Sequence, residues 1–192
     1  MPLSKPVRRR TLHTRQTLSH AFQREDGLWD IEARMTDVKT DPVNNPERGG
    51  FVAAGETFHD ISMRLTIDRE MKIHAVEAVM DSTPFKMCPR IAERYRLLEG
   101  TRIGPGWLRQ AAELTGSIQG CTHLNDLLRP LATTAFQALW PNEGVDNMDV
   151  GSQGVINTCH TWAQNSPAVK LYQPQYYSEQ PPAVRGKGRE EG

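Results

Sequence analysis

A cysteine and a histidine separated by one residue stand at the start of a predicted helix. Cys121 and His123 precede a run whose apolar residues recur at helical spacing: Leu124, Leu127, Leu128 and Leu131. With Thr122 as the predicted N-cap, Cys121 lies at a helix N-terminus, where backbone N–H groups and the helix dipole favour a thiolate. Asp126, three residues beyond His123, is expected to orient the imidazole ring. This stretch therefore predicts a thiol–imidazole centre.

Three further positions combine sulfur or imidazole with a predicted boundary between elements. Cys88 stands at the start of a predicted helix, and Cys159 is followed directly by His160. His59 begins a predicted strand after a loop that contains several glycines. In contrast, His13, His20 and His74 are isolated within strand patterns, so we expect them to have no role in a site.

Ligands of one metal ion commonly come from segments that are distant in sequence. Two short antiparallel helices between Cys88 and Cys121 would return the chain to the same end of the fold, so we expect these thiols to converge. Thiolate together with imidazole suits zinc or iron. The predicted ligand set is Cys88, Cys121 and His123, with His59 or Cys159 in the fourth position.

Composition excludes several classes of function. Among 192 residues, 23 Lys and Arg balance 23 Asp and Glu, so the net charge indicates neither a nucleic-acid partner nor a membrane surface. No apolar run approaches the length of roughly 20 residues that a membrane span requires. The N-terminal residues are basic without an apolar segment, and the cysteines are odd in number, which favours reduced thiols in the cytoplasm.

The pattern of the chain predicts strands first and helices afterwards, which is typical of an α+β fold. We expect a four-stranded antiparallel meander, then three helices packed on one face of the sheet. The strands fall in a hairpin over residues 12–40 and a second one over 58–81, with a structureless loop at 41–55 that could act as a flap. The expected helices are 91–98, 107–115 and 122–140, followed by a polar loop at 141–154, a helix or turn at 155–162 and an edge strand at 168–172.

The predicted domain organisation has three parts. A basic tail covers residues 1–11, a single α+β domain covers 12–175, and a tail at 176–192 is rich in proline, glycine and charge and is expected to be disordered.

Five segments carry a resemblance to a known family. They are RRRTLHTR (8–15), EDGLWDIE (25–32), HDISMRLTI (59–67), RIGPGW (102–107) and GCTHL (120–124), of which the last is the most specific. Together they resemble the bacterial family of domains of unknown function numbered 2889, over roughly residues 5–175. This resemblance implies no particular activity.

Residues 59–139 also resemble the iron–sulfur cluster scaffold proteins. His59-Asp60, Cys88 and Cys121-Thr122-His123 take places comparable to the Cys-Gly-Asp, the second Cys and the His-Cys of that family. Here the first cysteine is replaced by histidine, and the His/Cys pair is inverted and spaced by one residue. The resemblance therefore implies a mononuclear zinc or iron site better than a bridging cluster.

Three hypotheses of function remain open from the sequence. The first is a metal-binding enzyme or carrier that acts on a small-molecule substrate. The second is a metal-independent thiol enzyme in which Cys121, paired with His123 or His160, attacks an activated acyl group. The third is a non-catalytic module that binds a small molecule beneath the 41–55 loop.

Overall fold

The computed structural model of the protein describes residues 3–139 and 156–180. The chain divides into two compact units, Met1–Leu139 and Trp140–Gly192, which are described separately below. The single domain expected over residues 12–175 stays a prediction.

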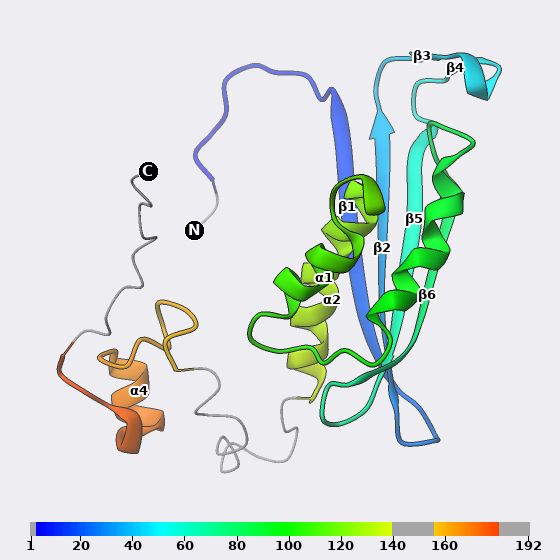
Figure 1. Ribbon diagram of the computed structural model, residues 1–192. Coiled ribbons are helices and arrows are strands. Elements are labelled where there is room, and N and C mark those ends of the chain that lie inside the picture. The colour runs from blue at the N-terminus through cyan, green and yellow to red at the C-terminus, as the bar shows by residue number, and fades with distance from the viewer. Residues whose placement is uncertain (1–2, 140–155, 181–192) are drawn as a thin grey trace, which may run out of the picture. The chain divides into compact units, whose positions relative to one another are not determined.

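A four-stranded antiparallel sheet forms the centre of the first unit (Figure 1). Its strands are β1 (His13–Gln23), β2 (Trp29–Lys39), β5 (Thr57–Ile67) and β6 (Ile73–Ser82). They lie in the order β1-β2-β5-β6, which confirms the antiparallel sheet of the predicted α+β fold. Alternation of apolar and polar residues explains the arrangement, because one face of each inner strand is buried and the other meets water.

The segment between the two hairpins has structure of its own, so the expectation of a structureless loop at 41–55 was wrong. It contains β3 (Val43–Asn45), the 3-10 helix η1 (Pro46–Arg48) and β4 (Gly50–Val52), with β3 and β4 paired. The buried Asn45 holds this hairpin, since its side chain accepts hydrogen bonds from the backbone N–H groups of Glu47 and Arg48 and donates one to the Pro84 carbonyl. Side-chain capping by Asn45 thus orders a segment that is rich in proline and glycine.

Helical elements follow the sheet. These are the 3-10 helices η2 (Cys88–Leu98) and η3 (Ser117–Gln119) and the α-helices α1 (Trp107–Thr115) and α2 (Thr122–Leu139). The α-helix expected at 91–98 is therefore a 3-10 helix, in which Tyr95 and Leu98 are buried, and their spacing of three residues matches the 3-10 period. Pro130 lies inside α2 without ending it.

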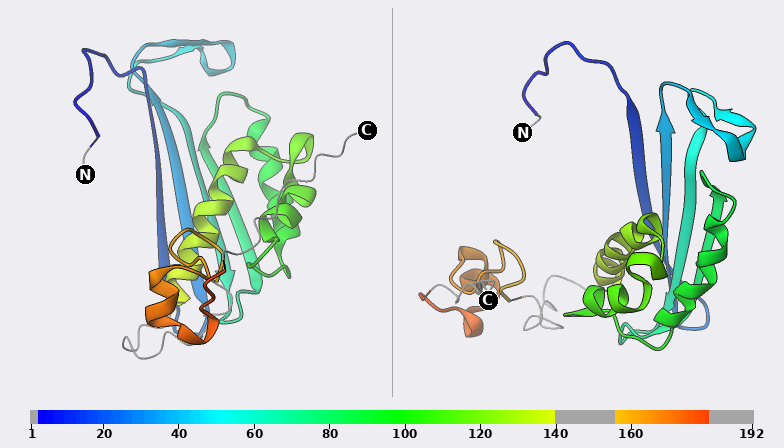
Figure 2. Two further views of the ribbon diagram at one scale, coloured as in Figure 1. Left: turned by 90° about the vertical axis from the view of Figure 1, so that its left-hand side faces the viewer. Right: turned by 45° about the horizontal axis from the view of Figure 1, so that its top comes forward.

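The hydrophobic core lies between the inner face of the sheet and the helices. α2 packs over β1, β2 and β5, whereas η2 packs against β6 (Figure 2). The sheet contributes buried residues at alternate positions, and α2 contributes the apolar stripe predicted from its spacing: Ile31, Ala33, Met35, Ile61, Met63, Leu65, Leu124, Leu127, Leu128 and Leu131. This packing places the start of α2 over the end of the sheet at which β2 ends and β5 begins.

In the second unit, turns at 156–162 lead into α4 (Pro167–Tyr172) and the 3-10 helix η5 (Pro174–Tyr176). The edge strand expected at 168–172 is thus a helix, because Ser166 caps the Val169 N–H and Pro167 suits the first helical turn. The expected loop at 141–154 and most of the C-terminal tail lie outside the described residues. Across the two described ranges, we find no helix with the length and apolarity to span a membrane.

Candidate functional site

Three charged or titratable residues form a row across the inner face of the sheet. The strand register pairs Arg15 on β1 with Asp37 on β2, and Asp37 in turn with His59 on β5. Asp37 and His59 occupy the inward positions that continue the apolar alternation of their strands, and both are buried. The register therefore places a carboxylate and an imidazole side by side at the end of the core.

Asp37 is surrounded by donors. Its Oδ1 accepts hydrogen bonds from Nε of Arg15 at 2.8 Å and lies 3.0 Å from Nε2 of His13. Its Oδ2 lies 2.8 Å from Nη2 of Arg15 and 2.9 Å from Nδ1 of His59. Three hydrogen bonds and the contact with His13 thus surround one carboxylate, which can accept about four hydrogen bonds.

These contacts keep Asp37 ionised. Burial raises the pKa of its carboxyl, but the hydrogen bonds and charge of Arg15, the hydrogen bond from His59 and the charge of His13 outweigh it and lower the pKa to about 2. An ionised carboxylate only accepts hydrogen bonds, so the proton between Asp37 and His59 belongs to Nδ1 of the imidazole. Nε2 of neutral His59 then carries a lone pair.

His123, in the first turn of α2, stacks on His59. The centroids of the two rings are 3.9 Å apart and the rings are tilted by 36°. Burial is the largest cause that lowers the pKa of both imidazoles; a proton on His123 would lower the pKa of His59 further, and the charge of Arg15 lowers the pKa of His123. Both shifts favour the neutral ring, which is the form that binds metals and acts as a base.

One atom of each of Asp37, His59 and His123 forms a group of possible ligands within 4.8 Å of one another. Across residues 3–139 and 156–180, this is the one convergence of three or more histidine, cysteine or carboxylate groups. The sequence predicted two of its members and missed Asp37.

Cys121 borders this group without belonging to it. Its Sγ lies 4.0 Å from Nδ1 of His123. Its carbonyl accepts the first hydrogen bond of α2, from the Asn125 N–H at 2.9 Å, so Cys121 rather than Thr122 occupies the N-cap position. The thiol therefore lies at the helix N-terminus, as predicted, and beside an imidazole.

A buried tyrosine fixes the backbone of Cys121. The Tyr95 hydroxyl accepts from the Cys121 N–H at 3.0 Å, and it lies 3.0 Å from the Cys121 carbonyl and 2.8 Å from Oδ1 of Asn125. Asn125 in turn donates to the Thr115 carbonyl. These bonds tie the end of α1 to the start of α2 and hold the Cys121–His123 turn above the sheet.

Gly120 makes the tight approach to this turn possible. A Cβ at position 120 would lie 1.7 Å from the carbonyl oxygen of Thr115, a distance that no side chain tolerates. The glycine is therefore required by the close contact between the α1 end and the segment that enters α2.

The other two predicted thiol ligands are not members of this group. Cys88 begins η2 and is not part of the convergent group, and Cys159 belongs to the second unit. Asp126, expected to orient His123, instead accepts a hydrogen bond from Arg15 at 3.0 Å. His13, expected to have no role, contacts Asp37. All three cysteines are free.

Sequence reasoning missed Asp37 although a signal was present. The period-two pattern that buries Ile31, Ala33 and Met35 reaches position 37, so a carboxylate stands on the apolar face of a strand. A buried carboxylate needs a partner, and Arg15 lies opposite it when β1 and β2 pair across the predicted turn.

A family model described as "Protein of unknown function (DUF2889)" matches residues 13–137, which include every residue of the convergent group. The chain belongs to this family. No curated protein and no solved structure matches the chain. The match thus confirms the resemblance to the 2889 family over residues 13–137, and the description of the family supplies no activity.

Proposed function

We propose that the convergent group is a mononuclear metal centre, with zinc or iron as its metal, that acts on a small-molecule substrate. The observation that carries this proposal is that a ring nitrogen of His59, a ring nitrogen of His123 and a carboxylate oxygen of Asp37 lie within 4.8 Å of one another. Two neutral imidazoles beside a carboxylate are a donor set typical of first-row transition metals. Since Cys121 is the one cysteine beside the group among the described residues, a mononuclear site is favoured over a bridging cluster.

In this proposal Asp37 orients His59 and does not itself bind the metal. Its oxygens already meet Arg15, His13 and His59, so binding a metal directly would require Arg15 to leave. A carboxylate that accepts from one nitrogen of an imidazole fixes the other nitrogen as the ligand atom. His59 therefore offers Nε2 to the metal, and Asp37 sets its tautomer and orientation.

Cys121 is the nearest further ligand. Its Sγ lies 4.0 Å from Nδ1 of His123, and a rotation about its side-chain torsion changes the direction of the sulfur. Two nitrogens and a thiolate leave a tetrahedral metal one position for water or substrate, which is the arrangement of a catalytic site. The metal would supply Lewis-acid chemistry there, and the free cysteines favour a reducing compartment such as the cytoplasm.

Metal analysis of the 192-residue chain tests the proposal. Purified wild type is expected to bind about one equivalent of zinc or iron, as measured by mass spectrometry of the metal content. His59→Ala and His123→Ala should each lower the bound metal at least about tenfold. His74→Ala is the matched control, because this half-exposed histidine pairs with Asp68 away from the group. A folded wild type that takes up neither metal on titration would contradict the proposal.

A second candidate rests on the contact between Cys121 and His123. A thiol at a helix N-terminus and 4.0 Å from an imidazole nitrogen is arranged as a nucleophile with its base, which suits transfer of an activated acyl group. Iodoacetamide labelling distinguishes the two candidates. Labelling of Cys121 near pH 7 that is fast and unaffected by chelator supports the thiol enzyme, whereas labelling that chelator accelerates supports the metal centre.

A further inference from the structure

The two edges of the sheet differ in how they are covered. The segment after η2 pairs with the outer edge of β6 near its start. The Gly100 N–H donates to the Ile73 carbonyl, and the Ile73 N–H donates to the Thr101 carbonyl. The backbone of Lys72 also forms an isolated antiparallel β-bridge with that of Arg102. β1 forms the opposite edge, and within the described residues no strand pairs with its outer side. A bare edge exposes backbone donors and acceptors that can pair with another strand.

β1 carries few of the features that normally protect an edge strand. It is 11 residues long, contains no proline, and pairs with β2 in one continuous register without a bulge. Its one charged side chain at neutral pH, Arg15, bends inward to Asp37, and this inward charge is the one protective feature that the strand carries. Short strands, prolines, bulges, charges along the edge and inward-pointing charges are the usual means by which proteins block pairing at an edge, and β1 has only the last of them.

The identity of the free backbone groups follows from the pairing with β2. The Thr40 N–H donates to the Leu12 carbonyl, and the Arg24 N–H donates to the Leu28 carbonyl. At both ends of this segment, the even-numbered residues therefore direct their backbone groups toward β2. In an antiparallel ladder the positions between them direct their N–H and C=O groups to the other side. The odd-numbered residues from His13 to Gln23 thus present their backbone groups at the free edge.

β1 is complementary to a second copy of itself. Leu18 is the central residue of His13–Gln23, and an antiparallel pairing about a two-fold axis at Leu18 uses the whole strand. In that register every free odd-numbered residue faces an odd-numbered residue of the other copy, so that both sets of backbone groups are satisfied. Leu18 then faces Leu18 of the second copy.

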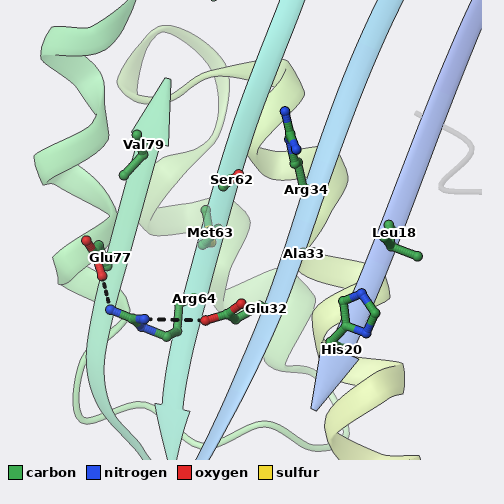
Figure 3. A pocket seen from close by; sticks show the side chains of 10 residues that line it. All are labelled: Leu18, His20, Glu32, Ala33, Arg34, Ser62, Met63, Arg64, Glu77 and Val79. Carbon is green, nitrogen blue, oxygen red and sulfur yellow. Dashed lines mark hydrogen bonds and ion pairs between the residues drawn. The ribbon is translucent and has the colours of Figure 1, made fainter. Parts of the chain in front are cut away.

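The side chains also fit this register. Arg15 faces Ala21 of the second copy, so no two positive charges are opposed. On the outer face, the second copy would partly cover three exposed apolar side chains. These are Leu12, Leu18 and Phe22, of which 58%, 60% and 49% is exposed. Figure 3 shows Leu18 and His20 side by side on β1, at the margin of an open hollow over the outer face.

We propose that the protein forms a two-fold symmetric dimer through β1, in which two four-stranded sheets join into one continuous sheet. The dimer also bears on the candidate site, because His13 and Arg15, the two β1 residues that hold Asp37, would gain cover from the second copy. The proposal does not depend on a metal, so it stands or fails separately from the proposed function.

Measurement of mass in solution by light scattering tests the dimer. The full chain is expected at twice 21.6 kDa, and Leu18→Lys, which opposes two ammonium groups on the axis, should return it to 21.6 kDa. Val79→Lys is the matched control and should stay dimeric, because Val79 lies on the same outer face but on β6, away from the edge that pairs (Figure 3). The circular dichroism spectrum and melting temperature of Leu18→Lys should equal those of wild type that has been diluted until it is monomeric.

Cross-linking tests the register. Leu18 faces itself as a non-hydrogen-bonded pair with Cα atoms about 4.5 Å apart, which suits a disulfide. Leu18→Cys should therefore form a covalent dimer on mild oxidation, whereas Phe22→Cys, which faces Thr14 of the second copy, should cross-link at least about tenfold more slowly. A wild type that is monomeric from about 1 µM to about 1 mM, or a dimer that Leu18→Lys leaves intact, would overturn the proposal.

Discussion

Nδ1 of His59 lies 2.9 Å from Oδ2 of Asp37, and the two residues are direct partners on neighbouring strands. The same carboxylate is held on its other side by Arg15, so its negative charge is balanced before any ligand arrives. The contact fixes the tautomer of His59 and leaves Nε2 as its reactive atom.

Replacing the buried carboxylate should destabilise the fold. Asp37→Asn leaves Asp126, which is half-exposed, as the carboxylate partner of Arg15 and replaces the charged acceptor of His59 by a neutral amide. We expect a loss of about 2–3 kcal/mol in the free energy of unfolding. Urea denaturation measures it. Asp60→Asn is the control, because its Arg34 pair lies at the surface and should cost at most about 1 kcal/mol. Equal losses in the two variants would contradict the role given to the burial of Asp37.

Acid should remove the contribution of Asp37. Its pKa of about 2 in the folded protein lies below the value of 3.8 expected for an unfolded aspartate. A lowered pKa stabilises the fold above the unfolded value, and this stability disappears as pH falls through about 4 toward 2. Unfolding free energies measured in this window should fall more steeply for wild type than for Asp37→Asn.

The two stacked imidazoles should make the metal-free protein sensitive to mild acid. Burial lowers the pKa of His59 and of His123 below 6.5, so the unfolded chain binds protons first as pH falls. Stability should therefore decrease as pH falls below about 6.5 and level off once the folded protein is also protonated. His123→Gln should flatten this dependence, and His74→Gln should not. An unchanged slope in His123→Gln would show that the acid sensitivity originates elsewhere.

Adding a methyl group at position 120 should disrupt the turn into α2. Gly120→Ala would place Cβ 1.7 Å from the Thr115 carbonyl oxygen, so the backbone must move, at an expected cost of more than about 2 kcal/mol. Gly104→Ala is the matched control, since no heavy atom lies within 4 Å of its Cβ position. Thermal unfolding of both variants checks the prediction, which fails if Gly120→Ala melts at the wild-type temperature.

Removing one hydroxyl should loosen Cys121. Tyr95→Phe leaves the Cys121 N–H and the Asn125 amide without their shared partner, at a cost of about 1–3 kcal/mol. The rate at which iodoacetamide labels Cys121 should change with it, because the thiol is positioned by this backbone. Tyr172→Phe, at a half-exposed tyrosine in α4, should alter neither quantity. A labelling rate equal to wild type in Tyr95→Phe would mean that the hydroxyl does not position the thiol.

Local patterns in the sequence determined the elements around the site. The alternation of Ile61, Met63 and Leu65 predicts β5, and the leucine spacing after His123 predicts α2, because each depends on residues within one strand or one helix. The sequence pattern predicts the wrong local structure where a side-chain cap determines it. The side chains of Asn45 and Ser166 accept backbone hydrogen bonds in segments that were expected to be a loop and a strand.

Tertiary structure alone decided which residues meet. His59 and His123 were chosen from the sequence as isolated candidates, whereas Asp37 and Arg15 join them through strand register, which pairs positions 22 residues apart. Cys88 looked equivalent to Cys121 along the chain, yet only Cys121 lies beside the group. Residue type and period are properties of a short segment, but register and helix packing depend on the burial of the whole sheet, and that is where the site is assembled.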